Sequence, residues 1–216
     1  MENDFTELFD QWAHTYDDTV GGRDVEYRDI FHLYEEILAE VVTHSKGTVL
    51  EFGVGTGNLS NRLLKNGFSV VGIEPSKKMR EQARRKNPDL LLYEGDFLQF
   101  PSLTQQVDTI ASTYAFHHLT DEEKQKAFDL YHKTLSNEGQ VVFADTMFET
   151  EESKQQMIHK AKAMGFHRLA FDLQSEFYTT LPALSQMAQS AGFTARFKPL
   201  NSYVWLMIAK KNDSPK

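Results

Sequence analysis

From residue 48 onward, short apolar runs alternate with stretches in which apolar residues recur at helical spacing. This alternation is typical of βαβ units, in which helices cover both faces of a parallel sheet. The runs are almost continuously apolar, as strands buried on both faces are. We therefore expect an α/β fold with strands at 48–52, 68–73, 90–94, 107–112 and 140–145 and helices near 57–66, 76–86, 121–135 and 181–191.

The last two apolar runs, 194–200 and 202–210, are separated by almost no sequence. Parallel neighbours need a crossover of about a dozen residues or more, so these two runs must pair as an antiparallel hairpin. With the five earlier strands, the pattern predicts a doubly wound, seven-stranded, mainly parallel sheet whose final strand is reversed.

The sequence before the first strand also has helical periodicity. Apolar residues predict one helix over 5–16 and another from Ile30 to Val42, with the Gly21-Gly22 pair between them. We assign residues 1–45 to an N-terminal helical cap that includes a lid, and residues 46–211 to the domain that contains the sheet. Both parts are expected to form a single compact unit.

The stretch 147–180 departs from the strand–helix rhythm. It predicts one helix to about Met164 and then an aromatic-rich segment. Because it follows the fifth strand, this insertion should lie at the carboxyl edge of the sheet, where open α/β sheets bind their ligands.

A glycine-rich turn follows the first strand. Gly53, Gly55 and Gly57 form the pattern G-x-G-x-G between this strand and the next helix. Glycines permit a tight turn and let a ligand approach the backbone, and the helix amino terminus offers unpaired N–H groups. A glycine-rich turn without a ligand would have the same sequence, so the interpretation depends on neighbouring residues.

Three carboxylates near this turn indicate a nucleoside-containing ligand. Glu51 lies inside the first strand, where a buried carboxylate needs partners such as loop N–H groups or a ligand ammonium. Glu74 ends the second strand, where an acid can accept both hydroxyls of a ribose. Asp96 follows the third strand and is placed to accept a hydrogen bond from an adenine amino group.

The sequence of the same turn discriminates between two classes of ligand, dinucleotides and S-adenosylmethionine. Dinucleotides place a pyrophosphate on the pattern G-x-G-x-x-G. Here Asn58 replaces the third glycine, and Glu51 would repel a phosphate. S-adenosylmethionine has no phosphate but carries an ammonium and a sulfonium, so the turn favours this cofactor over NAD and a methyltransferase over an NAD-dependent oxidoreductase.

Four sequence segments resemble, in order, motifs I to IV of the class I S-adenosylmethionine-dependent methyltransferases. They are VLEFGVGTGN, VVGIEPS, EGDFLQF and VDTIASTYAFHHL. The resemblance extends from about Thr48 to Lys210, and the closing hairpin matches the reversed final strand of that family. More narrowly, WAHTYD, GIEPS and TYAFHHLTDEEK resemble segments of the YrrT-type methyltransferases of Bacillus relatives.

This resemblance implies how the cofactor is bound. It places Gly53 against the methionine portion of S-adenosylmethionine, Glu74 on the ribose and Asp96 on the adenine. It also implies methyl transfer to an acceptor, although a sensor or partner subunit that binds the cofactor without catalysis would carry the same motifs. The further cofactor contacts that we expect are Glu51, Gly55 and Ala115.

The candidate catalytic residues are fewer. Methyl transfer mainly requires alignment of the reacting atoms, an effect that can supply ~7–11 kcal/mol, and a general base only where the acceptor must lose a proton. His117 could be that base, or His117 and His118 could cap the fourth strand and pack beneath the cofactor. Tyr16 and Tyr27 belong either to the lid, because TYDD resembles the lid segment of related methyltransferases, or to ordinary helix packing.

The acceptor is expected between residues 10–30, the His117-His118 turn and the insertion 147–180. An apolar, aromatic lining with few polar anchors favours a small acceptor over a protein or a nucleic acid. The side chains that these segments contribute are Trp12, Tyr16, Tyr27, Phe166, His167, Phe171 and Tyr178.

Composition excludes several other classes. A net charge of −8 argues against a nucleic-acid partner, and no apolar run approaches the length that spans a membrane. The chain has no cysteine, which excludes disulfides and thiolate metal sites and fits a cytoplasmic protein. No metal is expected, because Ser112 and Asp145-Thr146 provide too few oxygen ligands for a hard cation.

Overall fold

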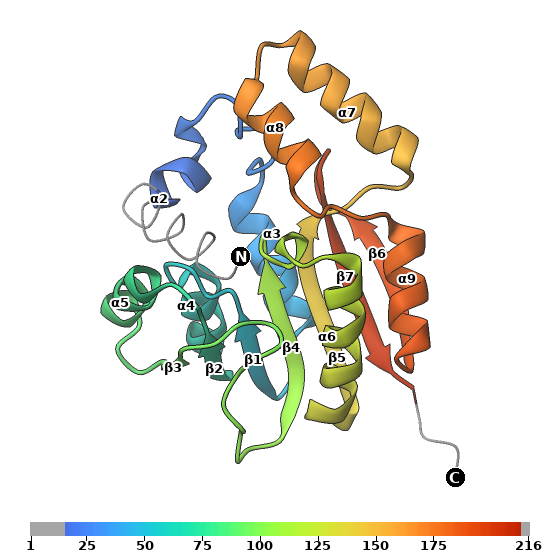
Figure 1. Ribbon diagram of the computed structural model, residues 1–216. Coiled ribbons are helices and arrows are strands. Elements are labelled where there is room, and N and C mark those ends of the chain that lie inside the picture. Colours follow the sequence, from blue (N-terminus) through green and yellow to red (C-terminus); the bar gives the residue numbers. More distant parts are fainter. Residues whose placement is uncertain (1–15, 213–216) are drawn as a thin grey trace.

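The computed structural model describes residues 16–212, and a seven-stranded sheet with helices on both faces forms its centre (Figure 1). The strand order is β3-β2-β1-β4-β5-β7-β6. Strands β1 to β5 are parallel, whereas β7 runs antiparallel to both β5 and β6, so the predicted sheet with its reversed hairpin is confirmed. The strands are β1 (Thr48–Phe52), β2 (Ser69–Ile73), β3 (Leu91–Tyr93), β4 (Val107–Thr113), β5 (Leu135–Thr146), β6 (Phe193–Pro199) and β7 (Val204–Lys211).

Two apolar cores lie on opposite faces of this sheet. One contains side chains of α3 (Tyr34–His44), α4 (Asn58–Lys65) and α5 (Lys77–Lys86). The other contains side chains of α6 (Asp121–Thr134) and α9 (Leu181–Ser190). Successive residues of a strand point to opposite faces, and β1 accordingly directs its side chains into the two cores in turn.

The order of the strands brings the predicted site to one edge. The chain proceeds from β1 through β2 to β3 on one side and then returns to place β4 on the other side of β1. Ligands of open α/β sheets bind at such a reversal, beyond the carboxyl ends of the strands. The glycine turn after β1 and the short 3-10 helix η2 (Phe116–His118) after β4 both lie there.

The insertion is a closed excursion from the sheet. The Phe148 N–H donates to the Thr179 carbonyl at 3.2 Å, and the Leu181 N–H donates to the Phe148 carbonyl at 2.8 Å. Between these ends the chain forms the predicted helix α7 (Glu151–Ala163) and a second helix, α8 (His167–Ser175), which was not predicted. Both helices extend beyond the carboxyl ends of the strands, with α8 beside the N-terminal segment (Figure 1).

The N-terminal segment differs in part from its prediction. The predicted helix 5–16 and Trp12 lie outside the described residues, except for Tyr16, which begins the short helix α2 (Tyr16–Asp18). A π-helical turn, η1 (Thr19–Arg23), follows. The second predicted helix begins later than expected, because the backbone before Tyr34 is left-handed at Leu33 (φ 63°).

Within residues 16–212, no helix is long and apolar enough to cross a membrane.

Candidate active site

The three glycines of the turn after β1 all have left-handed backbones. Their φ values are 64° at Gly53, 56° at Gly55 and 85° at Gly57, a region that glycine enters at little cost. The Gly53 N–H donates to the Ile73 carbonyl at 3.0 Å, which fixes the turn to the end of β2. The sequence therefore has glycine where the backbone requires it.

Glu74 lies directly against this turn. Its Oε2 accepts the Gly55 N–H at 2.9 Å, and its Oε1 accepts the Ser76 N–H at 2.8 Å. The side chain is buried, and a carboxylate has about four acceptor positions in total. Glu74 therefore holds the glycine turn from the end of β2.

Asp96 follows β3 in a tight turn of its own. Its Oδ1 accepts the Leu98 and Gln99 N–H groups, both at 2.7 Å. Its Oδ2 accepts no hydrogen bond from residues 16–212. The carboxylate is thus fixed in orientation, with one oxygen available for the adenine contact that the resemblance implies.

Glu51 has a different partner from the one expected. It points from β1 toward α4, where its Oε2 accepts the Ser60 hydroxyl at 2.5 Å, instead of being held by loop N–H groups. Burial raises the pKa of Glu51 to about 8. Around neutral pH this carboxyl is therefore mostly protonated, so it would not repel a phosphate as the sequence suggested, and the preference against a dinucleotide rests on Asn58.

The turn leaves room for a ligand on one side only. A Cβ at Gly53 would lie 2.7 Å from the Ala115 Cβ, whereas a Cβ at Gly55 would meet no atom of residues 16–212 within 4 Å. Beneath the turn, the buried Ser112 hydroxyl has no hydrogen-bond partner among the described residues. Open space over Gly55, an unpaired hydroxyl and the Glu74 carboxylate fit a ligand with polar groups, such as S-adenosylmethionine.

A cleft of about 880 Å³ lies near the turn, between the N-terminal segment, α3 and α4. Its walls are largely polar and charged, and they include Asn58 and Lys86. Since neither Glu74 nor Asp96 lines this cleft, we do not place the cofactor in it.

His117 is held by a buried carboxylate. Its Nδ1–H donates to Asp145 Oδ1 at 2.6 Å, and its backbone N–H donates to Asp145 Oδ2 at 3.0 Å. The imidazole stacks on Tyr178, with ring centroids 4.7 Å apart. Burial lowers the pKa of His117, but the negative charge of Asp145 outweighs it, so this pKa lies above its usual value.

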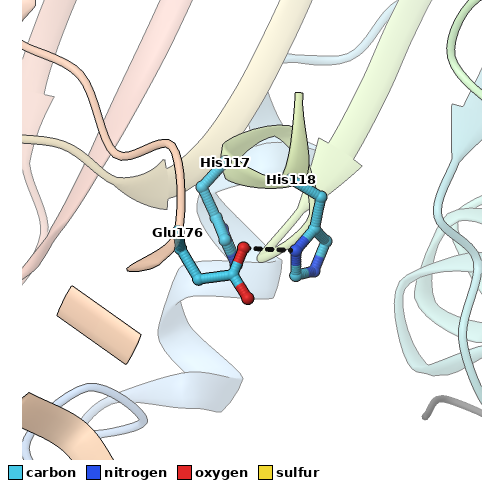
Figure 2. A group of neighbouring side chains, drawn as sticks. All are labelled: His117, His118 and Glu176. Carbon is cyan, nitrogen blue, oxygen red and sulfur yellow. Dashed lines mark hydrogen bonds and ion pairs between the residues drawn. The ribbon is translucent and has the colours of Figure 1, made fainter. Parts of the chain in front are cut away.

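His118 forms a second pair with the insertion. Its Nδ1–H donates to Glu176 Oε2 at 3.1 Å (Figure 2). Burial and the neighbouring His117 lower the pKa of His118. The Phe177 N–H donates to the His117 carbonyl at 3.1 Å, so the segment after α8 is bound directly to the histidine turn.

Tyr16 lies among other tyrosines at the edge of the glycine turn. Burial raises its pKa well above the usual value, and the nearby Tyr34, Tyr114 and Glu74 add to this effect. Its hydroxyl therefore stays protonated and cannot act as a base near neutral pH, although it can still donate a hydrogen bond.

The next residue fastens the N-terminal segment to the sheet. Asp17 Oδ1 accepts the Thr56 hydroxyl at 2.7 Å and the Asn58 amide at 3.1 Å, and Asp17 Oδ2 accepts a Lys86 N–H at 3.0 Å. The segment predicted as a lid is thus joined to the glycine turn itself.

A second set of contacts joins the N-terminal segment to α8. The Tyr27 hydroxyl donates to Asp172, and the Arg168 guanidinium lies 5.5 Å from the centre of the Tyr27 ring. Arg168 also forms ion pairs with Asp24 at 2.8 Å and with Glu26 at 3.1 Å. These contacts bring together the segments between which the acceptor was predicted to bind.

Not every residue predicted to line the acceptor pocket faces the site. Phe166 and Tyr178 are partly buried against the core, but His167 is exposed and Phe171 is 68% exposed. The reason is that α8 turns its apolar face, Leu169, Ala170 and Leu173, toward the core and its opposite face outward.

The sequence did not indicate the site roles of Ser60, Asp17, Asp172 and Glu176. Their partners are 9, 39, 145 and 58 residues away along the chain. Two of them left a signal: Asp17 belongs to the TYDD segment, and Ser60 lies near the start of α4, facing the strand that carries the buried Glu51.

Comparison with known proteins agrees with this geometry. A family model described as a methyltransferase domain matches residues 49–139. An uncharacterized methyltransferase of Oceanobacillus iheyensis is 49% identical over 211 residues, which cover 98% of this chain and 99% of that protein. Another from Bacillus cytotoxicus is 51% identical over 212 residues and covers 98% and 100%.

Solved structures with low sequence identity share the fold. The Synechocystis magnesium protoporphyrin IX methyltransferase with bound S-adenosylhomocysteine has a TM-score of 0.69 at 18% identity, covering 97% of this chain and 100% of that one. The DhpI complex with S-adenosylhomocysteine has a TM-score of 0.69 at 16% identity, covering 97% and 96%.

Proposed function

The chain belongs to the family of S-adenosylmethionine-dependent methyltransferases, and from this premise we propose that its acceptor is a small molecule bound beneath α8 and the N-terminal segment. When bound, S-adenosylmethionine supplies an electrophilic methyl carbon. The protein must then position the acceptor, exclude water and, where the acceptor carries a proton, receive that proton.

For the cofactor, we propose the residues that the resemblance implies. Glu74 would bind the ribose hydroxyls, Asp96 Oδ2 the adenine amino group, and the backbone at Gly53 and Gly55 the methionine portion. Ala115 packs against Gly53 and would shape the floor beneath it. Glu51 would support the glycine turn from behind, through its hydrogen bond to Ser60 of α4.

The observation that carries the small acceptor is the contact between Tyr27 and Asp172. Together with the Arg168 ion pairs, it holds the N-terminal segment against α8 over the carboxyl edge of the sheet. A folded protein or a duplex could not reach a reacting atom under this cover without its removal, whereas a small molecule could be enclosed by it.

For the proton, we propose His117. Because Asp145 accepts a hydrogen bond from the His117 Nδ1–H, the ring is held in the tautomer whose lone pair lies on Nε2. Ala115, two residues earlier in the same turn, packs beneath Gly53, so His117 lies close to the proposed methionine end of the cofactor. Tyr16 would contribute by hydrogen bonding and by covering the site rather than as a base.

An acceptor panel tests this proposal. The purified protein is incubated with S-adenosylmethionine and pools of small thiols, amines, phenols and carboxylic acids, and S-adenosylhomocysteine release and product mass are recorded. We expect release with one small-molecule class. Methyl incorporation only into added protein or nucleic acid would contradict the proposal, and release with none of the substrates offered would favour a cofactor-binding sensor.

The role of His117 is tested with the acceptor so found. Loss of a general base costs about 10²–10⁴-fold in rate, so His117→Asn should lower kcat within this range while the affinity for S-adenosylhomocysteine stays unchanged. His159→Asn is the matched control, because His159 is exposed on α7. Equal rates for both variants would show that no proton passes through His117.

A further inference from the structure

The histidine turn and the end of the insertion place three metal-ligating side chains together. His117, His118 and Glu176 each offer one ligand atom, and these atoms lie within 4.8 Å of one another (Figure 2). Two of the side chains come from η2 and one from the loop after α8. They are separated by nearly 60 residues of sequence, so only the fold brings them together.

We propose that His117, His118 and Glu176 form a binding site for a divalent transition-metal ion such as Zn²⁺. Two imidazole nitrogens and one carboxylate oxygen are a ligand set that zinc accepts in proteins, with a fourth position left for water or another molecule. No such site is expected from the sequence, because Glu176 does not belong to any recognisable motif.

The spacing of the atoms is close to what an ion needs. With bonds of about 2.0–2.1 Å, two ligands of a tetrahedral ion lie about 3.3 Å apart. His118 Nδ1 and Glu176 Oε2 are already 3.1 Å apart. The remaining separations are at most 4.8 Å, so a bound ion would have to draw the three side chains slightly closer together.

Asp145 supplies the outer support that metal-binding histidines usually have. A ligating histidine commonly donates its other ring N–H to a carboxylate, which fixes its orientation and makes it a better ligand. Asp145 binds the His117 Nδ1–H at 2.6 Å and leaves Nε2 for an ion. Asp145 is itself buried, so this arrangement is rigid.

The two elements that carry the ligands are also bound to each other. The Phe177 N–H donates to the His117 carbonyl, and Lys124 donates to the carbonyls of Leu119 and Phe177 at 2.5 and 2.6 Å. The ligand side chains are 12–20% exposed, which shields them but leaves an entry path. The positive Lys124 is offset by the carboxylates of Asp121 and Asp145.

A bound ion would affect the reaction in a definite way. The ion and the acceptor's proton would compete for the same lone pair on His117 Nε2, so zinc should inhibit methyl transfer to an acceptor that must lose a proton. This consequence rests on the proposed function, but the metal site itself does not.

Direct titration tests the site without cofactor or acceptor. The full chain is freed of metal with a chelator, and Zn²⁺ is titrated against a chromophoric competitor. We expect one ion per chain. Glu176→Gln and His118→Asn should each weaken binding by about tenfold or more, and Asp145→Asn by about 10–100-fold. Substitution with Co²⁺ should give visible ligand-field absorption that the same variants lose.

His159→Asn controls for adventitious binding to exposed histidines, and thermal unfolding shows that each variant is folded. Binding that is absent in the wild type, or that is equal in wild type, Glu176→Gln and His118→Asn, would overturn the proposal. Because the titration contains no S-adenosylmethionine, its failure would leave methyl transfer untouched, and inactivity toward every acceptor would leave the metal result untouched.

Discussion

Glu74 joins two parts of the site that the chain forms separately. It ends β2, yet its carboxylate holds the Gly55 N–H of the turn after β1. A ligand that contacts this carboxylate is therefore positioned relative to the glycine turn as well. The charge at this position matters more than the side chain's shape, because hydrogen bonds to charged groups are worth about 1.5–3 kcal/mol.

Replacement of Glu74 by glutamine should accordingly weaken S-adenosylmethionine binding by about 1.5–3 kcal/mol. Isothermal calorimetry measures this change directly. Glu94→Gln is the matched control, since Glu94 lies nearby but pairs with Arg80 on the surface. If both variants bind like the wild type, Glu74 does not contact the cofactor.

Glu51 makes the stability of the fold depend on pH. Its pKa is raised from 4.5 to about 8 by burial. Between these two values the folded chain retains a proton that the unfolded chain has released, so the free energy of unfolding falls as the pH rises through this window. Each pKa unit corresponds to about 1.4 kcal/mol.

Urea unfolding at several pH values between 5 and about 8.5 tests this linkage. Glu51→Gln should remove the contribution, so its stability should fall less than that of the wild type over this range. Glu94→Gln again serves as the control. Parallel curves for wild type and Glu51→Gln would mean that Glu51 titrates normally in the folded protein.

Gly53 is restricted by its neighbour as well as by its backbone. The sequence alone predicts that Gly53→Val blocks the cofactor and leaves the fold intact. The 2.7 Å approach to the Ala115 Cβ adds a folding cost to the left-handed backbone, which alone costs a non-glycine residue about 1–2 kcal/mol. A loss of cofactor binding in the valine variant could therefore come from a loss of stability instead of from blocking of the site.

A double-mutant cycle separates the two contributions. Gly53→Ala should destabilise the protein by more than the backbone cost, and Ala115→Gly in the same chain should recover the excess. Urea unfolding of the four proteins measures this coupling. Additive effects would show that the turn can move away from Ala115, and the contact would then have no role in shaping the floor of the site.

At the level of elements, the N-terminal segment and α8 are joined directly, and we propose that they act as one cover. Their contact includes a partly buried hydroxyl–carboxylate pair and the ion pairs of Arg168, whose side chain is 60% exposed. Exposed ion pairs contribute little stability, about 0–1 kcal/mol. The cover should therefore open easily and be stabilised by whatever binds beneath it.

Hydrogen exchange measures this opening. Residues 16–30 should exchange more slowly when S-adenosylhomocysteine is bound, and Arg168→Gln should exchange faster than wild type in the empty protein. Arg196→Gln is the control, because Arg196 is exposed on β6. If the empty wild type is already as protected as the complex, the segment is not a lid and Tyr16 and Tyr27 are packing residues.

Elements with local signals were predictable from the sequence. The alternation of apolar runs located all seven strands, and the short 194–210 connection fixed the antiparallel hairpin, because both follow from neighbouring residues. The glycine turn and Glu74 were placed for the same reason. Helix α8 was missed because its aromatic residues hid the weaker helical spacing of Leu169 and Leu173.

Contacts between distant elements were not predictable. The pairing of Glu176 with His118, and of Asp172 with Tyr27, depends on how the insertion folds back over the sheet. Both acids lie in a segment of mixed polar and apolar residues that resembles an exposed surface, and nothing in their spacing indicates which residues they contact. The proposed donor side of the site thus rests on motifs, whereas the proposed acceptor side rests on contacts that only the structure gives.

For the whole molecule, cofactor choice should appear in its thermal stability. A ligand at 100 times its Kd stabilises the folded state by about 2.7 kcal/mol, and a chain of this size gains about 2–4 °C per kcal/mol. S-adenosylhomocysteine should therefore raise the Tm by roughly 5–10 °C. NAD at the same concentration should not change it.

Differential scanning fluorimetry with both ligands provides the measurement, and adenosine alone shows how much of the shift the nucleoside supplies. An equal rise with NAD would contradict the choice of cofactor that Asn58 favours.

The paired ends of the insertion also affect how this part of the chain can change during evolution. Phe148 meets Thr179 and Leu181 across its base, so the excursion leaves and rejoins the sheet at nearly one point. Lineages can lengthen, shorten or rewrite residues 149–178 without altering the register of any strand. The stretch that matches the methyltransferase domain ends at residue 139, before this point. Because we propose that this insertion covers the acceptor, it is the part to compare when relatives are sorted by substrate.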